Sequence, residues 1–199
     1  MVPDSTLALE GSASPQTSLR LAPIDRPSNL LVRLFNWVVR KQLGKVMMPA
    51  RVIYARLPRL LWCSLPMYWL LDRGLSLEKE LRHLIEVHVA SINGCSFCHD
   101  IHLAQAMRDK TNRAKLRALA SPESDQSVLN ARERAALRYV KEIARGGASE
   151  EAFAALRSCF SEREIVEITW LQAFTTYLLR MALPLGITSD GFCAIQEGK

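Results

Sequence analysis

The densest group of chemically reactive side chains lies between Leu81 and Met107, in the segment LRHLIEVHVASINGCSFCHDIHLAQAM. This segment contains Cys95 and Cys98, two of the five cysteines, and all four histidines. Thiols three residues apart share one face of a helix, and they can close a short disulfide where the local geometry allows it. The pattern indicates a functional site, and a Cys-x-x-Cys pair is compatible with redox chemistry, a metal or a haem.

The residues around the pair favour thiol chemistry. Asn93-Gly94 predicts a break between two helices, which places both thiols in the first turn of the second helix. Unpaired N–H groups and the positive end of the helix dipole stabilise a thiolate there. His102 lies one helical turn beyond Cys98, and His99 stands in the same relation to Cys95. A histidine so placed can accept the thiol proton or stabilise the thiolate, so we expect a dithiol redox centre.

Three other interpretations stay open from the residues alone. Zinc could bind Cys95, Cys98 and two histidines, although these ligands are closer together than the separated pairs of structural zinc modules. The run from Cys95 to His99 also matches the c-type haem attachment pattern, which requires export. Both cysteines could instead be buried and inert. We expect no metal ion and no cofactor.

Helical patterns dominate from Asn29 onward, and no alternating run of β-branched residues is bounded by a tight hairpin turn. The expected helices cover residues 29–43, 50–57, 59–72, 77–92, 95–107, 113–119, 130–145, 149–159 and 161–183. The expected helix starts are Ser76, Ser149, and the capping-box pairs Asn130 with Glu133 and Ser161 with Glu164. Gly44 and Gly74 are placed to end helices. The sequence therefore predicts an all-α, multi-helix bundle.

The composition fits one globular domain preceded by a tail. Of 199 residues, 49% are hydrophobic and 23% are charged, which is enough apolar side chain for a sizeable core. Residues 1–28 are rich in Ser, Pro and Thr, so we expect a flexible tail there and a single all-helical domain over 29–199. The net charge of +6 is scattered, and we expect no nucleic-acid partner. We also expect no membrane span and no signal peptide, and hence a cytoplasmic location.

The cysteine segment resembles the core of the carboxymuconolactone decarboxylase-like superfamily, in particular its alkylhydroperoxidase D-like branch. The motif of that branch is Glu, eleven residues, Cys-x-x-Cys, three residues and His, often with Asn-Gly directly before the first Cys. Asn93-Gly94, Cys95, Cys98 and His102 stand in that register. The resemblance covers roughly residues 45–190 and implies a helical bundle of the alkylhydroperoxidase D-like type. It also implies a homo-oligomer: a dimer, a trimer or a hexamer.

The chain departs from this motif at one position. His83 stands where the branch usually has Glu, the carboxylate that joins a proton relay to the residue matching His102. A histidine can relay a proton, but it does not supply the negative charge that raises the basicity of a partner histidine. Glu86, one turn from His83, is the candidate to replace that carboxylate in part.

The resemblance implies a thiol-dependent peroxidase. In that mechanism the Cys98 thiolate attacks a hydroperoxide and becomes a sulfenic acid, and Cys95 then condenses with it to form a disulfide. An external dithiol reductant restores the pair. His102 handles the proton, with His83 or Glu86 assisting. Two alternatives remain: a cofactor-free lactone decarboxylase-like enzyme of the same fold, and a non-catalytic helical oligomer.

The remaining reactive or aromatic side chains favour structural roles. His88 falls on an apolar stripe, so a core or interface position is expected. The residues expected to be small hydrophobes or surface thiols are Cys63, Cys159 and Cys193, and those expected in core or subunit contacts are Trp62, Trp69 and Trp170. Residues 30–45 form a basic amphipathic helix with Leu30, Leu31, Leu34, Trp37 and Val38 on its apolar face. We expect this face to pack on the domain or on a neighbouring subunit, with a membrane surface as the alternative.

Overall fold

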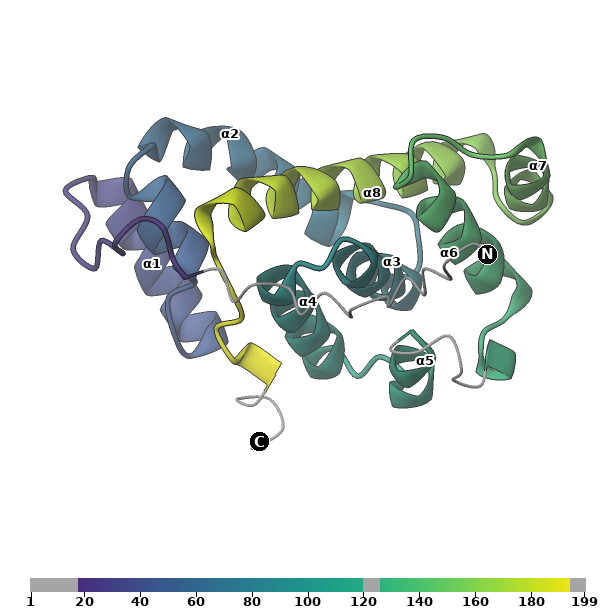
Figure 1. The fold of residues 1–199 in the computed structure, drawn as a ribbon, viewed down its shortest axis with the longest axis horizontal. Helices are drawn as coiled ribbons and strands as arrows, with labels where there is room; N and C mark the ends of the chain where they lie inside the picture. Colours follow the sequence, from purple (N-terminus) through teal and green to yellow (C-terminus); the bar gives the residue numbers. More distant parts are fainter. Residues whose placement is uncertain (1–17, 120–125, 194–199) are drawn as a thin grey trace, which may run out of the picture.

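The computed structural model describes residues 18–119 and 126–193, and in these residues the fold is entirely helical, without strands (Figure 1). The α-helices are α1 (Leu30–Leu43), α2 (Pro58–Trp69), α3 (Lys79–Ile92), α4 (Ser96–Arg108), α5 (Arg113–Ala118), α6 (Ala131–Ile143), α7 (Glu150–Cys159) and α8 (Glu162–Ala182). Short π turns η1 (Ala50–Tyr54) and η2 (Leu70–Gly74) flank α2, and 3-10 turns η3 (Gln126–Val128) and η4 (Leu183–Leu185) complete the set. The predicted all-α class is confirmed.

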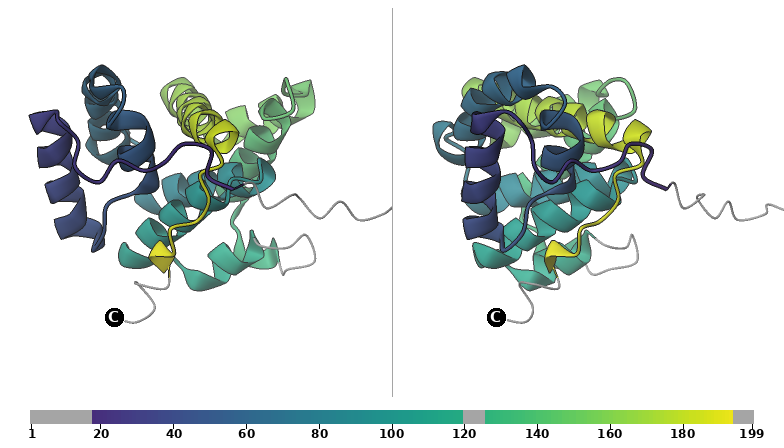
Figure 2. Two further views of the ribbon diagram at one scale, coloured as in Figure 1. Left: turned by 60° about the vertical axis from the view of Figure 1, so that its left-hand side comes forward. Right: turned by 90° about the vertical axis from the view of Figure 1, so that its left-hand side faces the viewer.

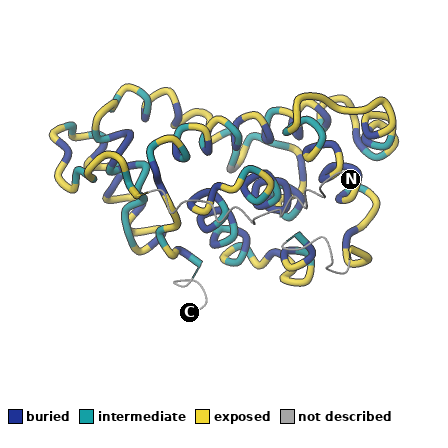
Figure 3. Tube along the Cα trace, in the orientation of Figure 1, coloured by how far each residue is buried: buried dark blue, intermediate teal, exposed yellow. Residues whose placement is uncertain are grey.

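Helix α3 forms the centre of the molecule. Figure 1 views it nearly end-on, with α4, α6 and α8 around it, and α8 spans the long axis above it. Eight of its residues are buried, on all sides of the helix: Leu81, His83, Leu84, Ile85, Glu86, Val87, Val89 and Ala90. Figure 3 shows this central helix as one of the most completely buried parts of the chain. A helix enclosed in this way holds its side chains rigidly, and it carries half of the site described below.

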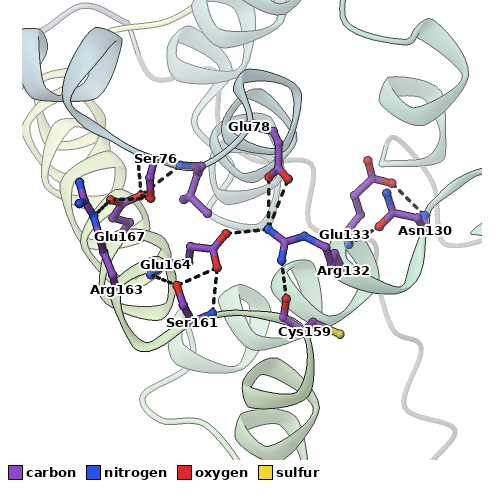
Figure 4. A network of polar contacts seen from close by, with 11 residues as sticks. Ser76, Glu78, Asn130, Arg132, Glu133, Cys159, Ser161, Arg163, Glu164 and Glu167 are labelled. Carbon is purple, nitrogen blue, oxygen red and sulfur yellow. Dashed lines mark hydrogen bonds and ion pairs between the residues drawn. The ribbon is translucent and has the colours of Figure 1, made fainter.

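The predicted helix starts hold, with one correction. Asn130 with Glu133 and Ser161 with Glu164 form complete capping boxes, and Ser149 caps α7. Ser76 does not cap α3, which begins only at Lys79. Instead, the carboxylate of Glu167 on α8 accepts hydrogen bonds from the backbone N–H groups of Ser76 and Leu77, at 2.8 and 3.1 Å (Figure 4).

Arg132 links three helices around the same region. Its guanidinium donates to Glu164 at 2.8 Å, lies 3.4 Å from Glu78, and sits 4.1 Å from the ring centroid of Phe160 (Figure 4). It also donates to the backbone carbonyl of Cys159. Together with Glu167, this arginine fixes the entry into α3 relative to α6 and α8.

Helices α1 and α2 lie at one end of the molecule (Figure 2). The apolar face expected for α1 is exposed within this chain: Leu30 is 74% exposed and Trp37 59%, whereas Val32, Asn36, Val39 and Leu43 are buried. The exposed large apolar side chains of α2 are Trp62, Leu65, Met67 and Trp69. Trp170 is half-buried and stacks on Phe174. Helix α1 therefore packs on the rest of the chain with a different face from the apolar one expected from the sequence pattern.

Residues 18–28, expected to belong to a flexible tail, run along the domain. Arg20 N–H donates to the carbonyl of Leu185, and Ile24 N–H donates to that of Arg51, both at 3.0 Å. Pro27 is buried. The first 17 residues of the expected tail lie outside the described residues. Among the described residues, no helix has the length and apolarity needed to cross a membrane.

Candidate functional site

The turn between α3 and α4 positions the two thiols. Gly94 has a φ of +65°, a left-handed conformation that glycine adopts without strain, and Cys95 N–H donates to the carbonyl of Ala90 at 3.1 Å. Cys95 is the N-cap of α4, and its sulfur accepts the backbone N–H of Cys98 at 3.3 Å. The Sγ atoms of Cys95 and Cys98 are 2.6 Å apart, both as free thiols. A disulfide, with its S–S length of about 2.05 Å, therefore needs little movement of either residue.

The pKa values of the two thiols shift in opposite directions. The pKa of Cys95 is lowered by the hydrogen bond between the two sulfurs and by hydrogen bonds from the N–H groups of Cys98 and Phe97, which together outweigh burial. The pKa of Cys98 is raised well above its usual value, by its hydrogen bond to Cys95, by burial and by the negative charge on that neighbour. The first proton thus leaves easily and the second is held, as expected for two strongly interacting acids.

Behind the thiols, a carboxylate lies between two histidines. Oε2 of Glu86 is 3.3 Å from Nδ1 of His83 and 3.7 Å from Nδ1 of His102. All three side chains are buried. Glu86 and His83 project from α3 and His102 from α4, so the packing of these two helices brings the three predicted residues together.

The chain of polar groups continues to the surface through two residues that the sequence did not indicate. Nε2 of His83 lies 3.0 Å from Oδ2 of Asp109, and this same oxygen is 2.8 Å from Nζ of Lys79, which is half-exposed. Asp109 is the residue that ends α4, and nothing in its spacing to the cysteines marks it. The polar groups therefore form a hydrogen-bonded path from Glu86 through His83 and Asp109 to Lys79, and His102 lies at ion-pair distance from the Glu86 end without a hydrogen bond from its Nδ1 to any described residue.

Burial and charge set the protonation of this path. Burial opposes ionisation of Glu86, but His102, His83 and Arg82 together hold its pKa below the usual value. Burial lowers the pKa of His102, and the negative charge of Glu86 opposes that effect. For Asp109, partial burial works against ionisation, yet hydrogen bonds from Lys79, Arg108 and His83 bring the pKa to about 2. At neutral pH the site thus pairs ionised carboxylates with a His102 that is available to accept a proton.

A cavity of about 640 Å³ opens onto this site. Its lining includes Cys98, His102, Glu86 and His83, but Cys95 is not part of it. The volume falls in the range of small-molecule sites. Of the two cysteines in the pair, Cys98 alone borders this cavity.

The walls of the cavity are mostly apolar and come from α1, α2, α4, α8 and η1. Aromatic side chains are prominent among them: Phe35, Tyr54, Tyr68, Phe97 and Tyr177. The hydroxyls of Tyr54 and Tyr68 are 2.8 Å apart, and burial, followed by the proximity of Tyr54, raises the pKa of Tyr68 well above its usual value. Sequence reasoning missed both tyrosines, because they precede Cys95 by 41 and 27 residues and have no motif of their own.

The other reactive side chains lie elsewhere. His99 is half-buried and does not line the cavity. His88 is half-buried as well, and burial, with a smaller effect of Lys141, lowers its pKa to about 4. Cys63 is exposed, and Cys159 and Cys193 are half-buried. No group of three or more His, Cys, Asp and Glu side chains in the described part of the chain is arranged to hold a metal ion.

The chain is similar to known proteins over most of its length. A family model for the carboxymuconolactone decarboxylase family matches residues 58–142, a span that runs from α2 to α6 and includes both thiols. An uncharacterised peroxidase-related protein from Silicibacter sp. TM1040 superimposes with a TM-score of 0.76 at 24% identity, over 92% of this chain and 98% of that one.

Two further solved structures share the fold. A protein of unknown function from Agrobacterium tumefaciens, described as the putative antioxidant defence protein AhpD, is 28% identical over 70% of this chain and 97% of its own, with a TM-score of 0.63. The debrominase Bmp8 is 21% identical over 86% of this chain and 93% of its own, with a TM-score of 0.73. For this debrominase and for the Silicibacter protein, both less than 25% identical to this chain, the likeness describes the fold alone.

Proposed function

We propose that this chain, which belongs to the carboxymuconolactone decarboxylase-like superfamily and has the alkylhydroperoxidase D-like fold, is a thiol peroxidase. The observation that carries the proposal is the pair of free thiols 2.6 Å apart, of which one, Cys98, lines a cavity beside His102 and Glu86. Such a pair can donate two electrons to a substrate as it forms a disulfide, and it regains them when a reductant restores the thiols.

The first step is attack of the Cys98 thiolate on the terminal oxygen of a hydroperoxide. The O–O bond breaks, Cys98 becomes a sulfenic acid, and the leaving alkoxide takes a proton to give an alcohol. The thiolate forms when the Cys98 proton passes to an ionised Cys95 or to His102, which lines the same cavity. The negative Glu86 then stabilises the positive charge on His102.

The second step closes the disulfide. The sulfur of Cys95 attacks the sulfenic sulfur of Cys98, the S–O bond breaks, and water leaves. An external dithiol then reduces the disulfide by exchange, becoming a disulfide itself. The net reaction converts one hydroperoxide and one dithiol into an alcohol, water and the oxidised dithiol. Because the cycle requires a reducing dithiol pool, we propose a cytoplasmic location for the protein.

A second candidate reaction uses the same two sulfurs. The aromatic cavity wall and the shared fold with a debrominase favour reductive dehalogenation of a halogenated ring. In that reaction the Cys98 thiolate takes the halogen from the ring, the ring carbon takes a proton, and Cys95 then displaces halide to form the disulfide. Electrons balance as in the peroxidase cycle, with halide released in place of water.

One experiment separates these reactions. Wild type, Cys95→Ser and Cys98→Ser are incubated with dithiothreitol and either cumene hydroperoxide or a bromophenol, and peroxide loss and bromide release are measured. We expect enzyme-dependent peroxide loss in the wild type, none in Cys98→Ser, and, when dithiothreitol is omitted, a sulfenic acid at Cys98 in Cys95→Ser. Bromide release without peroxide loss would refute the proposed peroxidase and support the proposed dehalogenase. Neither product, with both thiols oxidisable, would refute both proposals.

A further inference from the structure

A second large cavity, of about 860 Å³, lies on the other side of α1 from the thiol site. One face of α1, with Phe35, Val39 and Leu43, lines the thiol cavity, whereas Arg33, Asn36 and Arg40 line the second one. The residues of the second cavity are spaced three, four and seven apart, so they form a single stripe of the helix. We name it the arginine cavity, after Arg26, Arg33, Arg40 and Arg51 in its wall.

The charge of the arginine cavity is strongly unbalanced. Lys45 joins the four arginines, against two carboxylates, Asp25 and Asp190. Both carboxylates are engaged: Asp25 pairs with Arg51 at 2.5 Å, and Asp190 accepts the backbone N–H of Met48 at 2.8 Å.

The other guanidinium groups have no carboxylate partner in the described part of the chain. Across the described residues, none of the ion pairs involves Arg26, Arg33 or Arg40. Three guanidinium groups that border one cavity form a site for a multiply charged anion. Their planar donors match the oxygens of a phosphate group in particular.

Two further side chains of the arginine cavity, Trp37 and Asn36, suit a ligand in which an aromatic ring is attached to the anionic group. Trp37, 59% exposed, presents its ring at the cavity wall, where a planar ring can stack. Asn36 is only 8% exposed, and its Oδ1 has no hydrogen-bond partner among the described residues. A buried carbonyl oxygen without a donor is costly, and a ligand amino group would satisfy it once the amide turns towards the cavity that Asn36 lines.

We propose that the arginine cavity binds a nucleoside phosphate. The phosphates lie against Arg33, Arg40 and Arg26, the base stacks on Trp37, and an exocyclic amine of the base donates to Asn36. The volume of the cavity is sufficient for a ligand of this size. This inference does not depend on the reaction at the thiols.

The test is calorimetric titration of the full chain with ATP, pyrophosphate and adenosine at low salt. We expect ATP to bind more tightly than pyrophosphate, adenosine to bind far more weakly, and added salt to weaken ATP binding. Arg33→Ala with Arg40→Ala should weaken ATP binding by about tenfold or more. Trp37→Leu should remove the advantage of ATP over pyrophosphate. Bound ATP should also raise Tm in the wild type.

The matched control is Arg113→Ala with Arg117→Ala on α5, which removes the same charge from exposed positions outside the cavity. An equal loss of ATP binding in both double variants would show a non-specific charge effect and overturn the proposal. Absence of ATP binding at millimolar concentration would overturn it too. So would binding to phosphatidylserine vesicles without ATP binding, which would assign this face to a membrane. Equal affinity for ATP and pyrophosphate would overturn the part played by Trp37.

Discussion

The Glu86 carboxylate lies 3.7 Å from Nδ1 of His102. The family motif instead has its carboxylate at the position that His83 occupies in this chain. Glu86 projects from the next turn of α3, and it is buried together with its histidine partners. The negative charge expected of the relay is therefore present, although the motif residue is His83.

Glu86→Gln should slow peroxide consumption by about 10²-fold at neutral pH, because His102 loses the charge that stabilises its protonated form. The negative charge raises the pKa of His102, so its removal lowers that pKa further. The acid limb of the pH–rate profile should accordingly move to lower pH. Turnover from pH 5 to 9 and NMR titration of His102 measure both effects. An unchanged profile would exclude Glu86 from the relay.

His83→Glu should lower turnover rather than raise it. From the motif alone, this change restores the usual carboxylate and predicts faster peroxide loss. In the structure, position 83 lies between the carboxylates of Glu86 and Asp109. A third carboxylate there would raise the pKa of its neighbours by like-charge repulsion. The rate of peroxide loss under saturating dithiol shows whether turnover falls or rises, with His83→Gln as the uncharged control. A faster His83→Glu protein would show that the motif carboxylate matters more than its surroundings.

Mild peroxide should produce a reversible disulfide between Cys95 and Cys98. Their sulfurs are already 2.6 Å apart, whereas Cys63 is exposed and has no cysteine partner among the described residues. Peptide mapping before and after dithiothreitol shows the link. Cys63→Ser serves as the control and should leave its yield unchanged. Oxidation mainly at Cys63, Cys159 or Cys193 would mean that the assigned centre is wrong.

Glu167→Gln should destabilise the fold by about 1–3 kcal/mol at neutral pH, because Ser76 and Leu77 lose a charged acceptor for their N–H groups. Burial opposes ionisation of Glu167, but the bonds from Arg163, Ser76 and Leu77 lower its pKa. A lowered folded-state pKa gives stability above the unfolded value of about 4.3, and that stability is lost as pH falls through the folded pKa. The difference from wild type should therefore shrink in acid.

Urea denaturation at pH 7 and pH 3 measures this difference. Glu162→Gln, an exposed position in the first turn of the same helix, is the control and should change the free energy of unfolding by less than about 0.5 kcal/mol. Equal effects of the two substitutions would show that Glu167 does not stabilise the segment that leads into α3.

The exposed apolar side chains of α2 should form a subunit contact. Trp62 is 55% exposed and Trp69 63%, and they lie with Leu65 and Met67 on one helix. Exposed apolar patches of this kind mark interaction surfaces. Sedimentation of the wild type should show a homo-oligomer, and Trp62→Glu with Trp69→Glu should shift it towards 22.4 kDa. A wild type that sediments as a monomer at micromolar concentration would contradict this prediction.

The sequence by itself determined the helices and the thiol pair. Capping residues such as Asn130 and Ser161 act within one turn, and the Asn93-Gly94 break sets the first turn of α4 through local backbone geometry. The spacing from Cys95 to His102 likewise spans less than three turns of helix. Interactions of such short range can be deduced from neighbouring residues, because few chain conformations satisfy them.

The tertiary structure alone decided what surrounds the pair. Asp109 meets His83 and Tyr68 joins the cavity only because α2, α3 and α4 pack together, and Glu167 reaches Ser76 across 91 residues. The same packing buries Val32 and Val39 of α1 and leaves Leu34 exposed, although all three are apolar. Which face of a helix is buried depends on the shape and volume of its neighbours. That information is distributed over the whole chain and has no local pattern.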